Sequence, residues 1–244
     1  MTRYYLLLTM MMLSTGLPLF GQGYVPLLST NKTWDELYSD VNSITGLSGG
    51  GRLWVAGDSV LNGRVYQQIR RRAFYPLEGP VFDEPYGLTE ATFLWGLIRE
   101  DTAARQVFVY DQNEPGEEFL AYDFSLLPGD TLWYSDWPFI LDTIQPFILN
   151  NGDIRQQFFF RMYHSPPIEY GMYIEGIGGE TGLFHPMDYP IGPHNYLHCV
   201  AENGDFVYGA NCETYVLRNH HHQLVQFKPP YPNPTNGPLQ LELP

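Results

Sequence analysis

Basic residues are scarce in this chain of 244 residues, and their scarcity excludes several kinds of partner. Lysine and arginine together number 13 against 27 aspartates and glutamates, which gives a formal net charge of −14. Nucleic-acid binding requires a basic footprint that faces the phosphates, and docking on anionic lipid requires a similar one. The composition therefore argues against nucleic acid and anionic lipid as partners, and it predicts a well-solvated exterior.

Cysteine is scarcer still, because the chain contains only Cys199 and Cys212. An even count favours a disulfide in an oxidising compartment. Asn203-Gly204 is a turn signal between the two cysteines, so both sulfurs are expected at the open end of one hairpin. Closing a loop of this size contributes on the order of 3 kcal/mol. A metal site built on the two thiolates is the alternative, but no closely spaced cysteine pair supports it. We predict a structural disulfide.

Long apolar runs are missing from the body of the chain, and the one at the N-terminus is short. Arg3 precedes the apolar stretch 4–13, and small residues follow at Gly16 and Gly21. A membrane-spanning helix needs about 20 apolar residues, so this stretch is too short. The layout is typical of a secretory signal peptide. We predict a signal peptide over residues 1–21 and no transmembrane segment in the mature chain.

Helical periodicity is almost absent, and only residues 33–41 fit a short helix as well as a strand. Aromatic residues make up 16% of the chain, which favours pleated, half-buried surfaces. Short strand-like runs alternate with turn signals over residues 22–227. The predicted fold is all-β, an antiparallel meander of about ten short strands, and the pattern leaves a barrel and a sandwich equally open.

Turn residues predict which of these runs pair as hairpins. Asn62-Gly63 supplies both positive φ values of a type I′ turn, so residues 60–61 should pair with 64–69. Three further hairpins are expected, formed by residues 92–99 with 105–110, 139–144 with 154–163, and 196–201 with 206–208.

One motif offers a candidate nucleophile. Gly57-Asp58-Ser59 follows an apolar run and is similar to the start of the GDSL esterases, in which the serine attacks an ester. That family also needs an Asp-x-x-His near its C-terminus, and the chain has none. The related element Gly129-Asp130-Thr131 has no serine. We therefore expect both elements to be turns, and we predict no catalytic residue.

Histidines and acidic residues could in principle form a metal site. His194 and His198 would share one face of an extended segment, with His185 or Asp188 as a further ligand. No third ligand is fixed by the spacing, and His220–His222 is expected to be a solvated loop. Acidic residues could hold Ca²⁺ or act as acid and base, but no Asp-x-Asp-x-Asp-Gly loop is present. These acidic candidates are Glu100, Asp101, Glu117, Glu118 and Asp123. We predict no metal and no cofactor.

Aromatic residues offer the one candidate binding surface. Trp133, Tyr134 and Trp137 surround Asp136 and could stack against a carbohydrate. Packing in the core, or a surface hairpin, is the alternative.

The C-terminal segment carries a resemblance to a known export signal. Four prolines between Phe227 and Pro234 predict a semi-rigid linker, and Leu239, Leu241 and Leu243 alternate beyond it. The motif that carries the resemblance overlaps the end of this linker and consists of Tyr231, Pro232, Asn233, Pro234, Thr235, Asn236 and Gly237. Residues 228–244 resemble the opening of the C-terminal sorting domain of the bacterial type IX secretion system. The resemblance implies export across the outer membrane, with the type IX machinery as a partner.

The body resembles uncharacterised exported proteins that carry this signal. The shared pieces are Gly57-Asp58-Ser59 with Asn62-Gly63 and Tyr66, Ile98–Asp101 with Val107, Val109 and Tyr110, Leu120–Phe124, Gly129-Asp130-Thr131, Asp142-Thr143-Ile144, and Ile174–Gly178 with Gly182-Leu183. The resemblance implies an exported β domain without a transferable activity. The sorting domain normally has several more strands, so we expect either a fragment or a copy that stays in the periplasm.

These patterns lead to one expectation about function and two alternatives. We expect a secreted or cell-surface module that binds a glycan, a peptide or a matrix component without catalysis. A hydrolase of extracellular polymers is the first alternative, and it would need histidines and carboxylates to converge. A structural spacer domain of the cell envelope is the second.

Overall fold

The computed structural model describes residues 23–39, 47–76, 86–110, 117–134, 137–162, 168–187, 194–210 and 212. The predicted signal peptide and sorting segment lie outside these residues, as do Asp136, Asp188 and His220–His222. No helix occurs in the part that is described, so the all-β prediction is confirmed. For the same reason, no helix there is long and apolar enough to cross a membrane.

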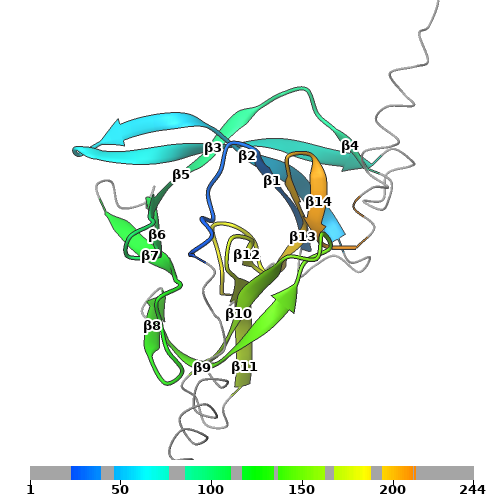
Figure 1. Cartoon of the computed structure of the whole chain (residues 1–244). Coiled ribbons are helices and arrows are strands. Elements are labelled where there is room, and N and C mark those ends of the chain that lie inside the picture. The colour runs from blue at the N-terminus through cyan, green and yellow to red at the C-terminus, as the bar shows by residue number, and fades with distance from the viewer. Residues whose placement is uncertain are drawn as a thin grey trace, which may run out of the picture.

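The strands form two antiparallel sheets (Figure 1). The order across the larger sheet is β14 (Asp205–Tyr208), β13 (His194–Glu202), β1 (Lys32–Ser39), β2 (Leu47–Leu61), β3 (Arg64–Pro76), β5 (Phe93–Asp101), β6 (Gln106–Tyr110) and β7 (Glu118–Asp123), with β4 (Tyr86–Leu88) paired to β3. The order across the smaller sheet is β12 (Gly178–Gly179), β11 (Ile168–Ile174), β10 (Ile154–Met162), β9 (Trp137–Ile148) and β8 (Thr131–Tyr134).

The two sheets follow a meander that returns on itself. Neighbouring strands follow chain order almost throughout, except that β13 lies beside β1. Among the described strands, no ladder joins β7 to β8 or β12 to β13, so the fold is a half-barrel and not a closed barrel. The described residues form fourteen strands where about ten were expected, and two of the additional strands, β4 and β12, are too short to carry a sequence pattern.

The predicted hairpins are confirmed. Asn62 and Gly63 have φ values of 51° and 75° and join β2 to β3. Asn203 and Gly204 have φ values of 54° and 89° and join β13 to β14. The pairs β5–β6 and β9–β10 match the other two expectations. Residues 33–41 fitted either a helix or a strand, and the described part of this range, residues 33–39, belongs to β1, because β2 and β13 pair with it on both sides.

The expectation that Gly57-Asp58-Ser59 forms a turn is wrong. The three residues lie inside β2, and the strand continues to the hairpin at Asn62. A β-bulge precedes them, where the register skips Ala56, and Gly57 takes a φ of 153° there. The bulge lets a long strand bend without ending, which a turn signal alone does not reveal.

Gly129-Asp130-Thr131, by contrast, does begin with a turn. Gly129 has a φ of 98°, and the Asp130 carboxylate accepts the amide of Leu127 at 2.8 Å. The two similar elements therefore adopt different conformations.

One hydrophobic core lies between the two sheets, with an aromatic cluster at its centre. The ring centroids of Phe124 and Tyr173 lie 5.1 Å apart, and those of Tyr122 and Tyr173 lie 5.3 Å apart. Both tyrosines are fully buried, so their hydroxyls need partners. The Tyr173 hydroxyl donates to the carbonyl of Asp123 at 2.7 Å, and the Tyr122 hydroxyl accepts the amide of Gly179 at 3.2 Å. These bonds link the two sheets.

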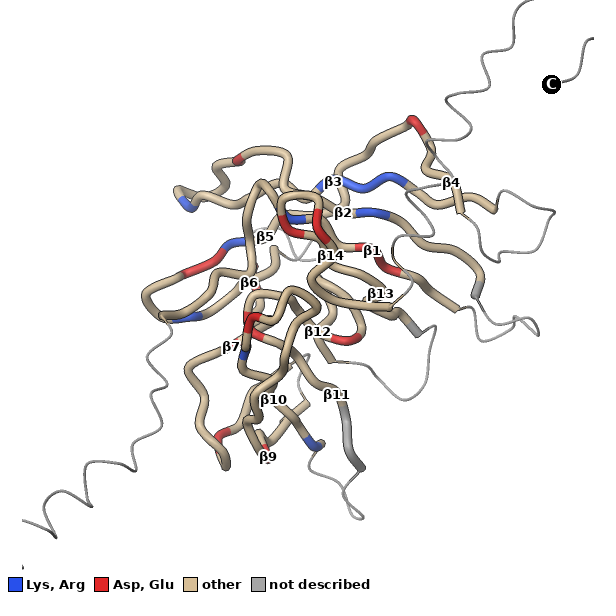
Figure 2. Tube along the Cα trace, turned by 45° about the vertical axis from the view of Figure 1, so that its right-hand side comes forward, with Lys and Arg blue, Asp and Glu red and all other residues tan. Residues whose placement is uncertain are grey.

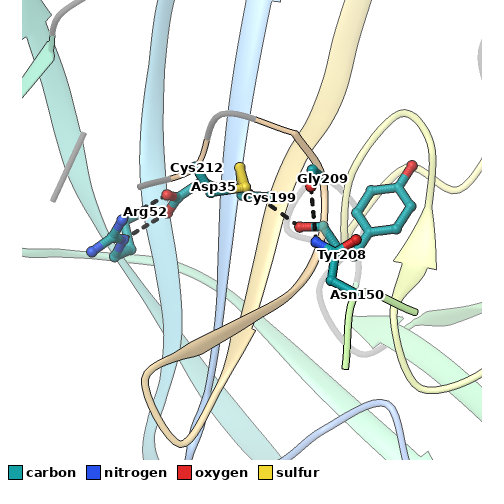
Figure 3. Close-up of a disulfide and its surroundings, with 7 residues drawn as sticks. All are labelled: Asp35, Arg52, Asn150, Cys199, Tyr208, Gly209 and Cys212. Atoms are coloured by element: carbon teal, nitrogen blue, oxygen red, sulfur yellow. Dashed lines mark hydrogen bonds and ion pairs between the residues drawn. A yellow bond between two sulfur atoms is a disulfide. The ribbon is translucent and has the colours of Figure 1, made fainter. Parts of the chain in front are cut away.

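The disulfide is confirmed. Cys199 on β13 is bonded to Cys212, both are buried, and their Cα atoms lie 5.9 Å apart (Figure 3). Close by, Asp35 on β1 accepts two hydrogen bonds from the Arg52 guanidinium, each of 2.6 Å. Gly209 fits against the bridge with a φ of 98°, and an added Cβ would lie 3.0 Å from each sulfur. The disulfide fits an extracellular or periplasmic protein.

Candidate functional site

The three aromatic residues predicted as a binding surface do not form one surface. Tyr134 on β8 pairs with Trp137 on β9, and both pack against the core. Trp133 pairs with Pro138 and leaves 66% of its surface exposed. Because side chains alternate along a strand, Trp133 faces away from Tyr134.

Tyr134 is held by packing and by one polar contact. Its ring centroid lies 5.7 Å from that of Phe119 and 6.4 Å from that of Phe139. Its hydroxyl lies 3.1 Å from Nδ1 of His185, and burial raises the pKa of the tyrosine. Tyr134 is therefore a core residue with one polar contact at its edge.

The backbone positions of the candidate histidines do not favour a shared metal site. His194 and His198 both lie on β13, where four residues of extended chain span about 13 Å. The register also skips at His198, which breaks the alternation on which a shared face depends. His185 lies after β12 and contacts Tyr134, and desolvation of its ring lowers its pKa. No group of three metal-binding side chains occurs among the residues that the structure describes.

Glu100 holds the segment that precedes β1. Residues 23–31, which we call the N-terminal strap, run into the space between the two sheets (Figure 1). The Glu100 carboxylate accepts the amide of Leu27 at 2.7 Å, the amide of Leu28 at 3.0 Å and the hydroxyl of Tyr24 at 2.5 Å. Burial and these contacts with the carboxylate raise the pKa of Tyr24. Glu100 is thus a structural anchor.

A second carboxylate and a buried lysine complete the attachment of the N-terminal strap. Glu175 accepts the amide of Val25 at 3.2 Å. The Lys32 ammonium group donates to the carbonyls of Pro26 and Gly176, and burial lowers its pKa. Sequence reasoning missed this attachment, because its carboxylates and amides are more than 70 residues apart.

Other candidate carboxylates also have structural partners. Asp101 caps a turn, Glu118 pairs with arginines across strands, and Asp123 caps the turn after β7. Their partners are the amides of Ala103 and Ala104 for Asp101, the guanidinium groups of Arg64 and Arg99 for Glu118, and Ser125 for Asp123. These contacts give the three carboxylates structural roles that require neither a metal ion nor catalysis.

A different cluster combines exposed aromatic rings with a buried cation. We call it the arginine–aromatic cluster, and it consists of Tyr38 on β1, Arg71 on β3, and Phe93 and Trp95 on β5. The guanidinium carbon of Arg71 lies 4.3 Å from the ring centroid of Trp95 and 5.5 Å from that of Tyr38. Phe93 and Trp95 make an edge-to-face contact at 5.9 Å. Each ring keeps more than a third of its surface exposed, whereas Arg71 is only 7% exposed.

Glycines on β2 provide the room for this cluster. Gly49 pairs with Tyr38, and Gly51 pairs with Ala73, two residues beyond Arg71. A Cβ on Gly49 would overlap the Tyr38 ring, and one on Gly51 would overlap Nε of Arg71. The glycine run 49–51 therefore lets two large side chains lie flat across the strand.

The charge of Arg71 has no close counter-ion in the described part of the chain. Its Nε is buried without a hydrogen-bond partner there. Glu36 on β1 is near enough for its pKa to respond to Arg71, but its Oε1 accepts the amide of Leu183 at 2.6 Å. Burial raises the pKa of Glu36 to about 7, although that amide and Arg71 both lower it. Near neutral pH Glu36 therefore carries only part of a negative charge.

The sequence holds one signal for this cluster. In the extended run of β3, Arg71 alternates with Ile69 and Ala73, and Ile69 is fully buried. Period-two alternation places the middle arginine of Arg70-Arg71-Arg72 on the inward face. An inward arginine in a strand calls for a partner, and this signal could have been read.

No family model, no curated protein and no solved structure matches this chain.

Proposed function

We propose that this chain is an exported, non-catalytic module that binds an extracellular glycan through the arginine–aromatic cluster. The observation that carries the proposal is the grouping of three partly exposed rings around Arg71. Sugar rings present C–H faces that stack on aromatic side chains, and guanidinium N–H groups donate to sugar oxygens. Strands of one sheet position all four side chains, which keeps such a site rigid.

The export part of the proposal rests on the ends of the sequence. Residues 1–21 have the layout of a signal peptide, and residues 231–237 resemble a type IX sorting motif. The disulfide is compatible with this route. On this proposal the type IX machinery is a partner during export, and the mature protein is secreted or displayed at the cell surface.

Glycan binding is tested by screening the mature chain against an array of extracellular polysaccharides and measuring hits by calorimetry. We expect Trp95→Ala and Tyr38→Ala each to weaken binding by roughly tenfold, because each removes a stacking surface. Trp133→Ala is the matched control, since it removes an exposed tryptophan from β8 and should leave binding unchanged. Failure to bind any glycan, or equal loss in the Trp133 control, would overturn the proposal and favour the spacer alternative.

A further inference from the structure

The buried and partly buried arginines of the described chain differ in whether a carboxylate pairs with them, and this difference indicates what kind of ligand the protein binds. Arg52, Arg99 and Arg155 have side chains that are 21%, 22% and 9% exposed, and each lies within 3.1 Å of a carboxylate oxygen. Arg71 is more buried than any of these three, at 7% exposure, yet no ion pair to it occurs within the described residues. A buried charge is costly unless it is paired. Its two aromatic neighbours offset only part of this cost.

We propose that the glycan bound by this protein is acidic, and that its carboxylate group pairs with Arg71. This inference rests on the proposed function and names the class of its ligand. A guanidinium group presents two parallel N–H donors that match the two oxygens of a carboxylate. A uronic acid combines such a carboxylate with a sugar ring that can stack on Trp95 or Phe93.

The charge distribution supports an anionic ligand at this place. The chain as a whole carries −14, yet β3 carries four arginines, at positions 64, 70, 71 and 72, and the neighbouring β2 carries Arg52 (Figure 2). Arg70 and Arg72 flank Arg71 in sequence but are exposed on the opposite face of β3, where Arg72 pairs in register with Arg52 on β2. Because Asp35 pairs only with Arg52, the charges of Arg70, Arg71 and Arg72 give this part of β3 a positive potential. An acidic polymer is thus attracted to these strands despite the overall charge.

Glu36 does not serve as the missing partner. Its Oε1 is held by the amide of Leu183, and an added Cβ on Gly182 would lie 2.6 Å from the same oxygen. The carboxylate is therefore fixed against the loop after β12, beyond ion-pairing distance of Arg71.

The test compares an oligouronate with the neutral oligosaccharide made from it by reducing its carboxyl groups. The two ligands share length and linkage and differ only in the group that we assign to Arg71. We expect the oligouronate to bind roughly tenfold to a hundredfold more tightly, as a charge-assisted pair should. A sulfated oligosaccharide of the same length is the third ligand and should bind less well than the oligouronate.

Three variants locate the effect. Arg71→Met should abolish the preference for the oligouronate, and Arg71→Lys should keep only part of it, because lysine lacks the fork. Arg72→Met removes the same charge from an exposed neighbour, and it should keep the preference. If Arg71→Met fails to fold, the lysine variant and the ligand pair on the unaltered protein still decide the question.

Two outcomes would overturn the inference and leave the proposed function standing. They are equal binding of the oligouronate and its reduced form, and tighter binding of the sulfated ligand. Binding of no glycan at all would remove both proposals together.

Discussion

At the scale of single residues, the protonation of Glu36 makes the stability of the protein depend on pH. Glu36 is held by an amide, and burial leaves its pKa near 7, above its ordinary value of 4.5. A carboxylate whose pKa is raised by folding binds its proton more tightly in the folded state. Its contribution to stability is therefore complete at low pH and is lost as the pH rises through about 7.

Replacing Glu36 by glutamine should flatten this pH dependence. The unaltered protein should lose roughly 3 kcal/mol of unfolding free energy relative to Glu36→Gln between about pH 4 and about pH 8, because only the carboxyl ionises. Urea unfolding of both proteins across this range measures the difference. Glu117→Gln, at an exposed position, is the control and should follow the unaltered protein. A constant gap between Glu36→Gln and the unaltered protein at every pH would contradict the assignment.

At the scale of elements, the N-terminal strap shows how a segment without regular structure becomes part of the core. Leu27 is fully buried, and the amides of Leu27 and Leu28 bond to Glu100 instead of to a neighbouring strand. A carboxylate thus replaces the ladder that a strand would supply, which satisfies amides that burial would otherwise leave unpaired.

Removing that carboxylate should release the N-terminal strap. We expect Glu100→Ala to lower the unfolding free energy by about 3 kcal/mol or more, since two buried amides and the Tyr24 hydroxyl lose their acceptor. Chemical denaturation measures the loss, and hydrogen exchange at Leu27 and Leu28 should accelerate. Glu117→Ala is the exposed control and should change stability by less than about 0.5 kcal/mol. Unchanged exchange at both amides would show that Glu100 does not hold the segment.

The elements also show what the sequence could and could not predict. Asn62-Gly63 and Asn203-Gly204 gave two hairpins correctly, because positive φ at both turn positions is a local property. The turn predicted at Gly57-Asp58-Ser59 is wrong, because a bulge inside a long strand depends on the partner strand and not on the local sequence. Strand alternation could place Arg71 on the inward face of β3. The aromatic partners of Arg71 lie on two other strands, so no local spacing could reveal them. Strand alternation alone separates Trp133 from Tyr134, and it was available from the sequence.

At the scale of the whole molecule, the disulfide reinforces the place where the meander returns to its first strand. Cys199 lies on β13, opposite Asp35 of β1, and Cys212 follows β14. The bridge therefore ties the residues just after the β13–β14 hairpin to β13, the strand that pairs with β1.

Replacing both cysteines by serine should lower the unfolding free energy by about 3 kcal/mol, because the unfolded chain regains the freedom of the closed loop. Urea unfolding with and without a reductant checks this value, and the reductant should have no effect on the double variant. The variant should still fold, since β1 keeps its ladders to β2 and β13. A stability that the reductant leaves unchanged in the unaltered protein would contradict this role for the bridge.

The pairing of β1 with β13 has a consequence for the time course of folding. Lys32 lies opposite Glu202, so the first described strand must wait for one near the other end of the described chain. Contacts between residues so distant in sequence slow folding, because a long loop must close before they form. While the later strands are absent, one edge of β1 stays unpaired and can pair with another chain. The unfinished chain should therefore aggregate less if other chains are kept away from it until β13 has paired with β1.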